Sequence, residues 1–261
     1  MTEEDQVRFR QALIAALPAV GVPLDEEQMT LCERFARHLL AVNERMNLTR
    51  ITGPEEMAIK HFADSLTVLS AVSVPAGSQV IDVGTGAGFP GMVLKIVRPD
   101  IRLTLLDSLS KRLRFLDETI SLLGLTGVDT VHLRAEDAGR DRRFRDRFDL
   151  VTARAVAALP MLLEWCGPLV RPGGSLLAMK GANAREETAA AGGLPERMNL
   201  RPVVEVRKIL PATDPSLEPS ERFLLVYRKS APTPARFPRR PADVARESNR
   251  AKGGENRPVD V

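Results

Sequence analysis

The chain has 261 residues, of which 44% are hydrophobic, and a formal net charge of +3. No apolar run approaches the roughly 20 residues needed to cross a bilayer, and the polar start MTEEDQVRFRQ is unlike a signal peptide. Cys32 and Cys166 lie far apart and outside any metal-ligand spacing, so neither a disulfide scaffold nor a metal site is indicated. We expect a cytoplasmic protein with one large α/β domain and a smaller subdomain.

Three helices are predicted at the start of the chain. Apolar residues recur at helical spacing over residues 4–17 and 25–46, and a third helix is expected from Pro54 to about Val72. The stretch from Pro18 to Pro23 separates the first two helices, and Asp25 is a candidate N-cap for the second. We expect these helices to form a subdomain over residues 1–75, packed on the edge of the main domain.

The stretch 79–97 predicts a buried strand at 80–83, a glycine-rich turn at 84–91 and the start of a helix. Gly84, Gly86 and Gly88 can take positive φ and carry no Cβ, so the backbone there can lie against a ligand. The free N–H groups and the positive dipole end of the following helix point at the same place. This order of elements predicts a nucleotide-cofactor pocket.

Two classes of cofactor share this geometry. Residues 86–91 satisfy G-x-G-x-x-G, the dinucleotide fingerprint. However, Asp82 precedes Gly84 by two residues, and a carboxylate there suits the ammonium group of S-adenosylmethionine and would repel a diphosphate. Pro90 also lacks a backbone donor that a diphosphate could use. We therefore favour an S-adenosylmethionine site over an NAD site or a structural glycine turn.

Strands and helices alternate after this turn. Strands are expected at 101–107, 148–154 and 175–181, and within 128–137, where the strand ends near Ala135 and Glu136. Helices are expected at 111–123 and after the strand 148–154, through Trp165. Such alternation predicts a doubly wound, mostly parallel sheet. Two late strands, 200–210 and 221–229, are joined by a Pro-rich loop and favour an antiparallel pair at the sheet edge. The main domain would cover residues 76–230.

Ligands of a doubly wound sheet sit at the carboxyl ends of its strands. Asp107 ends the second strand about 20 residues past the glycines, where an acid accepts hydrogen bonds from ribose hydroxyls; a helix cap is the alternative. Ser108 and Leu109 follow it, the leucine as an apolar floor for adenine. The third strand ends near Ala135 and Glu136. Ala135 leaves room for a flat ring such as adenine, and Glu136 is either a cofactor contact or a solvated acid in a turn.

Arg154 ends the fourth strand within TARAV, flanked by small residues. A cation at that depth pairs with a carboxylate, which could belong to the cofactor or to Asp82, or it forms a structural ion pair. In the third helix, His61 and Asp64 are three residues apart on one face. This spacing suits either a catalytic pair or a helix-surface hydrogen bond.

The absence of two known motifs limits the kinds of methyl acceptor that this site could serve. After the fourth strand, TARAV replaces the Asn/Asp-Pro-Pro-aromatic run of amino-directed nucleobase methyltransferases. Cys166 lies late on a helix, unlike the nucleophilic cysteine of pyrimidine C5 enzymes. Guanine N7, whose lone pair lies in the ring plane, needs neither device, and the sequence identifies no general base. Catalysis would then consist of alignment and electrostatic stabilisation.

The basic surplus lies in a tail at residues 231–261, which we expect to be flexible. From Arg228 onward there are nine Lys and Arg against four acids, so the remainder of the chain is slightly acidic. A Pro- and Arg-rich tail is either a disordered, solvated segment or a means of holding phosphate backbones.

These motifs together resemble the bacterial small-subunit rRNA guanine-N7 methyltransferase family, also called the glucose-inhibited division protein B family. The resemblance covers about residues 40–241, and the joint occurrence of GTGAGFPG, HFADSL and ARAV makes it specific. The matching strings are NLTRIT (47–52), KHFADSL (60–66), IDVGTGAGFPG (81–91), LLDSLSKRLRFL (105–116), RAED (134–137), ARAVAAL (153–159), MKG (179–181) and TPARFPRRP (233–241).

The resemblance implies a monomeric class I methyltransferase fold that methylates N7 of one guanosine in small-subunit (16S) rRNA, either as free rRNA or in the 30S particle. It implies S-adenosylmethionine contacts by Gly84, Phe89, 107–109, Ala135, Glu136 and Arg154. It also favours RNA contacts, through phosphate attraction, by Arg236, Arg239 and Arg240. The chain beyond Pro241 departs from the family's ending.

Three competing hypotheses stay open on the sequence alone. The protein could be a ribosome-assembly factor that binds RNA without turnover, a small-molecule methyltransferase on the same fold, or, less favoured, an NAD-dependent oxidoreductase.

Overall fold

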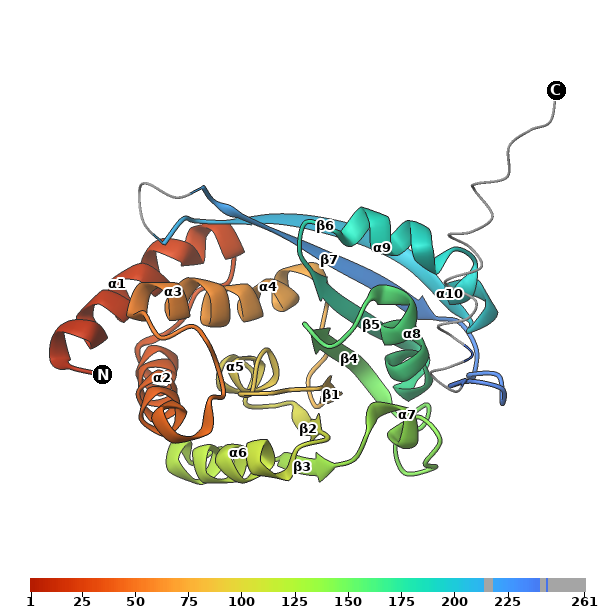
Figure 1. Ribbon diagram of the computed structural model, residues 1–261, viewed down its shortest axis with the longest axis horizontal. Coiled ribbons are helices and arrows are strands. Elements are labelled where there is room, and N and C mark those ends of the chain that lie inside the picture. Colours follow the sequence, from red (N-terminus) through yellow and green to blue (C-terminus); the bar gives the residue numbers. More distant parts are fainter. Residues whose placement is uncertain (214–217, 240–242, 244–261) are drawn as a thin grey trace.

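The computed structural model describes residues 1–213, 218–239 and 243. In this part of the chain a seven-stranded sheet has the order β3-β2-β1-β4-β5-β7-β6 (Figure 1). The first five strands pair in parallel, and β7 runs antiparallel to both β5 and β6. In chain order the strands are Gln79–Val83 (β1), Arg102–Asp107 (β2), Val128–His132 (β3), Phe148–Arg154 (β4), Val170–Lys180 (β5), Leu200–Leu210 (β6) and Ser220–Lys229 (β7). The predicted doubly wound sheet with a late antiparallel pair is confirmed.

Helices cover both faces of this sheet, because side chains of each strand alternate between two hydrophobic cores. In β5, for example, Leu177 belongs to one core and Leu176 to the other. The first core contains side chains of α1 (Glu3–Val20), α2 (Glu26–Met46), α3 (Pro54–Met57), α4 (Asp64–Ala71), α5 (Gly91–Val97) and α6 (Ser110–Leu123). The second contains side chains of α7 (Ala135–Ala138), α8 (Leu159–Cys166), α9 (Ala184–Ala191) and α10 (Leu194–Arg197).

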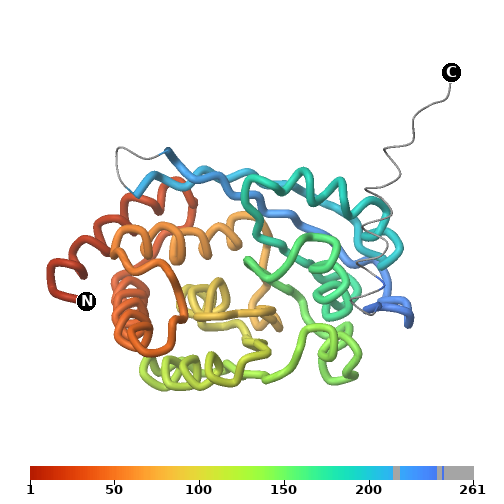
Figure 2. The backbone as a smooth tube through the Cα atoms, viewed as in Figure 1, coloured from red at the N-terminus to blue at the C-terminus, as the bar shows by residue number. Residues whose placement is uncertain are grey.

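The N-terminal helices begin with N-capping motifs, and their apolar side chains pack into the core of the main domain. Both α1 and α2 start with a capping box, formed by Thr2 with Asp5 and by Asp25 with Gln28. Phe9, Phe35 and Phe62 meet in edge contacts inside the first core. The tube in Figure 2 shows α2 lying beside α6, and residues of the two helices are in contact. Residues 1–75 thus share one core with the sheet.

The third predicted helix is continuous from Pro54 to Ala71 but changes its winding. Between α3 and α4, residues Ala58–Ala63 form a π-helical turn that contains His61. π-turns are rare and cluster at functional sites. Both His61 and Asp64, which follows the turn, are buried, with 8% and 2% of their surfaces exposed.

The structure corrects three details of the expected elements. The third strand ends at His132, and Ala135–Ala138 form helix α7, because the extended Arg134 acts as its N-cap residue. The first helix includes Pro18 and ends only at Gly21, whose φ is 78°. Helices α9 and α10, between β5 and β6, were not predicted; their Ala-, Gly- and Pro-rich sequence carries little apolar periodicity.

Candidate active site

The glycine-rich turn lies between β1 and α5, and its glycines have different surroundings. Gly84, Gly86 and Gly88 all have positive φ, as predicted. A Cβ at Gly84 would lie 2.8 Å from Cγ2 of Val156, and these two residues line one cavity at this end of the sheet. A Cβ at Gly88 would instead meet the core side chains of Met92 and Leu116 at 2.7 and 2.9 Å. Gly84 therefore keeps a cavity open, whereas Gly88 allows close packing behind it.

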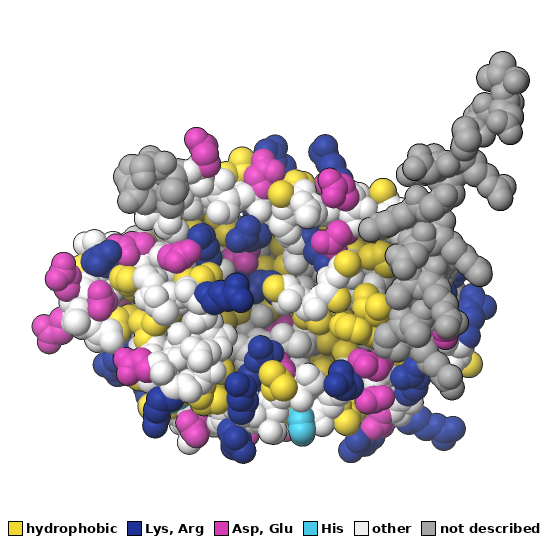
Figure 3. Space-filling model, viewed as in Figure 1, with side chains coloured by type: hydrophobic (Ala, Val, Ile, Leu, Met, Phe, Trp, Pro, Cys, Tyr) yellow, Lys and Arg dark blue, Asp and Glu magenta, His cyan; other side chains and the backbone are white. Residues whose placement is uncertain are grey.

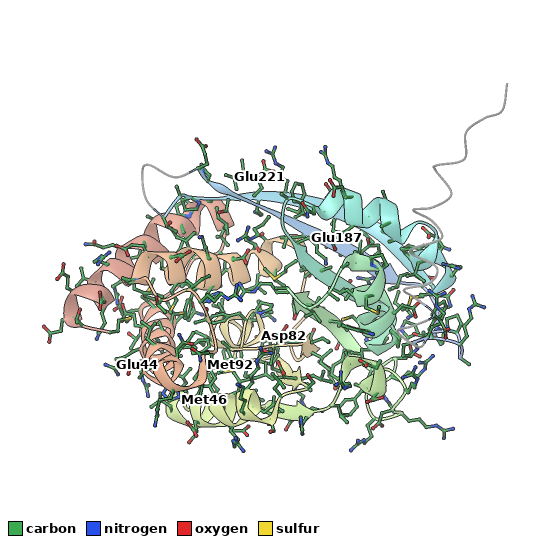
Figure 4. All side chains as sticks on the ribbon, in the orientation of Figure 1. Glu44, Met46, Asp82, Met92, Glu187 and Glu221 are labelled. Atoms are coloured by element: carbon green, nitrogen blue, oxygen red, sulfur yellow. The ribbon has the colours of Figure 1, made fainter. Side chains whose placement is uncertain are left out.

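Asp82 lies beneath this turn, fully buried (Figure 4). Its Oδ2 accepts a hydrogen bond from the N–H of Gly91 (3.0 Å), and its Oδ1 accepts one from the hydroxyl of Thr152 (2.9 Å). Burial raises the pKa of Asp82 to about 6. The carboxylate thus ties the start of α5 to β4, and its predicted contact with a cofactor ammonium stays a prediction.

We expect Asp82→Asn to separate these two roles. An amide can still accept from Gly91 and donate to Thr152, so the fold should be retained. Between pH about 4 and 6 the unfolded aspartate is ionised while the folded one keeps its proton, so the contribution of Asp82 to stability falls as pH rises through this window. His61, whose pKa is lowered to about 3, contributes with the opposite sign in both proteins. Denaturant titrations at several pH values should therefore show the wild type losing stability relative to Asp82→Asn as pH rises from about 4 to 6. Equal pH profiles for the two proteins would contradict the raised pKa.

The same variant tests the predicted cofactor contact. If the negative charge of Asp82 attracts the donor's ammonium group, Asp82→Asn should weaken S-adenosylmethionine binding by about tenfold. An unchanged dissociation constant at pH 8, where wild-type Asp82 is ionised, would assign Asp82 to the architecture of the turn alone.

A cavity of about 260 Å³ opens at the carboxyl ends of β1, β2 and β4. It is lined by Val83, Gly84, Leu106, Asp107, Ser108, Arg112, Leu133, Arg134, Ala135, Glu136, Ala155, Val156 and Trp165. The structure therefore brings together five of the predicted cofactor residues: Gly84, Asp107, Ser108, Ala135 and Glu136. Leu109 does not line it and is 43% exposed.

Asp107 organises this cavity. It is 2% exposed and accepts hydrogen bonds from the N–H of Gly86 (3.0 Å), the N–H of Leu109 (2.9 Å) and Nη1 of Arg112 (3.2 Å). A carboxylate has about four acceptor positions, so one is left for a ligand hydroxyl. Arg112 is the one side-chain donor of the three and can move aside. The buried acceptor at Asp107 suits a ribose hydroxyl, and the open space at Gly84 suits the amino-acid end of S-adenosylmethionine.

Phe89 lies behind the glycine-rich turn and lines neither this cavity nor the neighbouring one that contains Arg154. Its ring is 4% exposed, stacks on His61 (centroids 4.5 Å apart) and on Phe35 (5.0 Å), and receives the guanidinium of Arg154 (5.3 Å). Its predicted cofactor contact stays a prediction; the observed contacts support the residues of the neighbouring cavity.

A second cavity, of about 580 Å³, lies next to the first and shares Ala155 and Val156 with it. Its other lining residues are Ile51, Lys60, His61, Asp64, Arg154, Ala157, Ala158, Met179, Lys180, Gly181, Glu187 and Arg222. The loop after β4 thus forms a common wall, and Ala155 in it takes an unusual positive φ of 56°.

Arg154 lines this second cavity and forms a structural ion pair with Asp64, which was one of the expected alternatives, and no hydrogen bond with Asp82; its contact with a cofactor carboxylate stays a prediction. Nη1 donates to Oδ2 of Asp64 (3.0 Å) and to the carbonyl of Lys60 (2.9 Å), and Nη2 contacts Nδ1 of His61 (3.1 Å). Arg222 approaches the other oxygen of Asp64 (3.2 Å). The predicted pair of His61 and Asp64 is therefore joined through Arg154 and not by a helix-surface hydrogen bond.

His61 is held in its neutral form. Burial, and then the charge of Arg154, lowers its pKa to about 3. Since Arg154 can only donate, Nδ1 of His61 accepts, and Nε2 donates to the hydroxyl of Thr49 (2.9 Å). Thr49, Lys180, Glu187 and Arg222 were not predicted as site residues, because only the tertiary fold brings their elements together.

The start of the tail is docked on the domain. Arg145 donates to four carbonyls, those of Gly139, Thr233, Pro234 and Phe237. Phe237 is 2% exposed. The backbone N–H of Arg239 (3.0 Å) and its Nε (2.6 Å) donate to the fully buried Glu164, next to Trp165 of the first cavity. Residues 233–239 therefore fasten the wall of that cavity.

The three predicted RNA-contacting arginines differ in their surroundings. Arg236 is exposed, with its guanidinium 5.0 Å from the ring centre of Phe237. Arg239 is paired with Glu164, and Arg240 lies outside the described residues. RNA contact by these residues stays a prediction. On the face shown in Figure 3, further Lys and Arg side chains gather in the middle of the molecule, between α4 and α6.

Comparison with known proteins decides the family. The model of the family described as rRNA small subunit methyltransferase G matches residues 28–207. The chain belongs to this family. It is 47% identical to ribosomal RNA small subunit methyltransferase G of Symbiobacterium thermophilum, over 90% of this chain and 96% of the relative, and 42% identical to that of Caldanaerobacter subterraneus, over 88% and 94%.

Solved structures agree on the fold. A SAM-dependent methyltransferase from Aquifex aeolicus matches with a TM-score of 0.50 at 17% identity, covering 69% of this chain and 97% of its own. The resemblance drawn from the motifs and the class I methyltransferase fold are thus confirmed. The family also confirms an enzyme that uses S-adenosylmethionine, and it does not favour the oxidoreductase hypothesis.

Two further findings concern the described residues only. No helix among them has both the length and the apolar character to cross a membrane. No group of three or more His, Cys, Asp or Glu side chains is placed there to hold a metal ion.

Proposed function

We propose that this protein methylates N7 of a guanosine in small-subunit (16S) rRNA, with the donor in the first cavity and the target base in the second. By family, the chain is an S-adenosylmethionine-dependent methyltransferase of small-subunit rRNA. The observation that carries the arrangement is the common wall: both cavities contain Ala155 and Val156, so a donor and a base can meet across one loop. We further propose a monomer that acts in the cytoplasm.

In the first cavity, the lining residues would bind and orient the methyl donor. Asp107 and the turn at Gly84 would hold the ribose and the amino-acid end, and Ala135 and Glu136 would flank the adenine. When bound, S-adenosylmethionine supplies an electrophilic methyl group carried by a sulfonium. The protein's contribution is to fix that group against the base at the Ala155–Val156 wall.

On the acceptor side, no general base is required, because the N7 lone pair is free before attack. His61 supports this view: it is neutral, and both ring nitrogens are engaged, by Arg154 and Thr49. We propose that His61 and Asp64 hold Arg154, and that Arg154 positions the base. A mobile proton is not needed at any of these atoms.

The test is transfer of labelled methyl groups from S-adenosylmethionine to purified 30S particles and to free 16S rRNA, followed by mass-spectrometric mapping of the product. We expect one 7-methylguanosine. Binding of RNA without label transfer would support the assembly-factor hypothesis instead, and methylation at another atom would refute the assignment to N7. The two substrates show whether an assembled particle is needed.

The tail is tested by ending the chain after Arg239. This truncation keeps the docked residues 233–239, whose loss would expose Phe237 and unpair Glu164. It removes Arg240 together with residues 241–261, in which four Lys and Arg are matched by four acids. We expect weaker binding to 16S rRNA, by about three- to tenfold at low salt, with a smaller salt dependence. Unchanged affinity and salt dependence, measured by filter binding, would remove residues 240–261 from the RNA interface.

A further inference from the structure

Glu187 of α9 faces the second cavity with an oxygen that no described residue engages. Its Oε2 accepts a hydrogen bond from the N–H of Leu159 (2.7 Å) and forms an ion pair with Nζ of Lys180 (2.7 Å). Its Oε1 has no partner among the described residues, and its side chain is 25% exposed. One oxygen of this carboxylate is therefore fixed by the protein, and the other is without a partner among the described residues in a side chain that lines the cavity.

The second carboxylate of the cavity is not available in the same way. Asp64 is 3% exposed at its side chain: Oδ2 accepts a hydrogen bond from Arg154 (3.0 Å), and Oδ1 is buried without a hydrogen bond, 3.2 Å from Nε of Arg222 in an ion pair. A ligand donor would have to displace a guanidinium from a buried charge, which is costly. Glu187 is thus the carboxylate of this cavity that can accept a hydrogen bond from a ligand.

The order of the strands places Glu187 on the side of the cavity away from the donor. The first cavity lies over β1 and β2, the common wall follows β4, and Lys180, which holds Glu187, ends β5. Neighbouring strands lie about 4.8 Å apart. Figure 4 shows Asp82 and Glu187 on opposite sides of β4. In guanine, N7 and the N1–H and amino donors likewise lie on opposite edges of the ring.

We infer that Glu187 reads the target base by accepting hydrogen bonds from N1–H and the exocyclic amine of guanine. This inference rests on the proposed function. With these donors at Glu187, N7 faces the wall formed by Ala155 and Val156. Adenine has no N1–H and presents an acceptor there, so the carboxylate would repel it.

The same contact also favours the reaction. The N7 lone pair forms the bond to the methyl carbon while the carbon–sulfur bond breaks, and that electron pair stays on sulfur. No proton leaves, so the base gains a positive charge, and its N1–H and amine become stronger donors. A carboxylate bonded to them therefore stabilises the transition state more than the ground state.

Glu187→Gln tests this with little change of structure. The amide oxygen can still accept from Leu159 and Lys180, while the amide NH₂ replaces Oε1 and meets the guanine donors with another donor. Glu186→Gln is the matched control, since Glu186 is its exposed neighbour in α9. The first measurement is equilibrium binding of guanosine 5′-monophosphate and inosine 5′-monophosphate, which lacks the amine, without any donor. The wild type and Glu186→Gln should prefer the guanine nucleotide, and Glu187→Gln should not.

The second measurement is single-turnover methylation of 30S particles whose mapped target is guanosine or a single ligated inosine. We expect Glu187→Gln to lower the rate on guanosine by about 10- to 100-fold, with unchanged donor affinity and melting temperature, and to lose most of the wild-type preference for guanosine over inosine. A variant with the wild-type rate, or one slowed equally on both bases, would overturn the inference. Absence of methylation by the wild type itself would instead refute the proposed function.

Discussion

Arg154→Ala is expected to lower kcat for rRNA methylation by about 100-fold or more, with less than a threefold change in donor affinity. The guanidinium contacts Asp64, His61 and the carbonyl of Lys60, all outside the donor cavity. Its removal leaves the position of the base undefined at the wall shared by the two cavities. Single-turnover rates and calorimetric titration of the donor measure the two effects separately.

Stability must be followed in the same variant, because Asp64 is left with Arg222 as its one charged partner among the residues that the structure describes. We expect a loss of about 1–3 kcal/mol in the free energy of unfolding. Arg171→Ala removes an arginine that is paired with Asp149 on the surface and serves as the matched control. Arg154→Lys keeps the charge without the planar fork, so it should remain strongly impaired. Normal turnover in Arg154→Ala would reduce Arg154 to a structural residue.

Asp107→Asn should weaken S-adenosylmethionine binding by about 1–3 kcal/mol, which corresponds to about 5- to 150-fold in Kd. The carboxylate accepts from Gly86, Leu109 and Arg112, and its remaining acceptor position is the one available to a ribose hydroxyl. An amide has one acceptor oxygen and cannot serve all of these donors.

The single tryptophan of the chain, Trp165, lines this cavity, so its fluorescence can report donor binding directly. Asp117→Asn is a suitable control, because Asp117 lies on the exposed side of α6 and contacts Thr130. A Kd for Asp107→Asn equal to that of the control would remove Asp107 from the binding site.

The sheet could be predicted because its strands carry strong local signals. Alternating or continuous apolar runs marked β1, β2 and β4, and strand ends identified Asp107 and Arg154 before the topology was known. Ala135 and Glu136 line the cavity, although they belong to helix α7 and not to a strand end, and their contact with adenine stays a prediction.

The contacts of the site could not be predicted in the same way. Arg154 is 90 residues from Asp64 in sequence, and the spacing of His61 and Asp64 on one helix says nothing about a third partner. The π-turn at Ala58–Ala63 has no composition signal of its own. Glu187 lies in a helix of weak periodicity, so neither its position nor its free oxygen could be inferred without the fold.

Arg145 and Glu164 form hydrogen bonds with residues 233–239 and hold this segment on the domain. Glu164 is adjacent to Trp165, which lines the first cavity. During synthesis, these contacts cannot form until residues 233–239 have left the translating ribosome. Chains that stop short of Arg239 would leave the buried Glu164 without this partner, directly beside Trp165 of the first cavity.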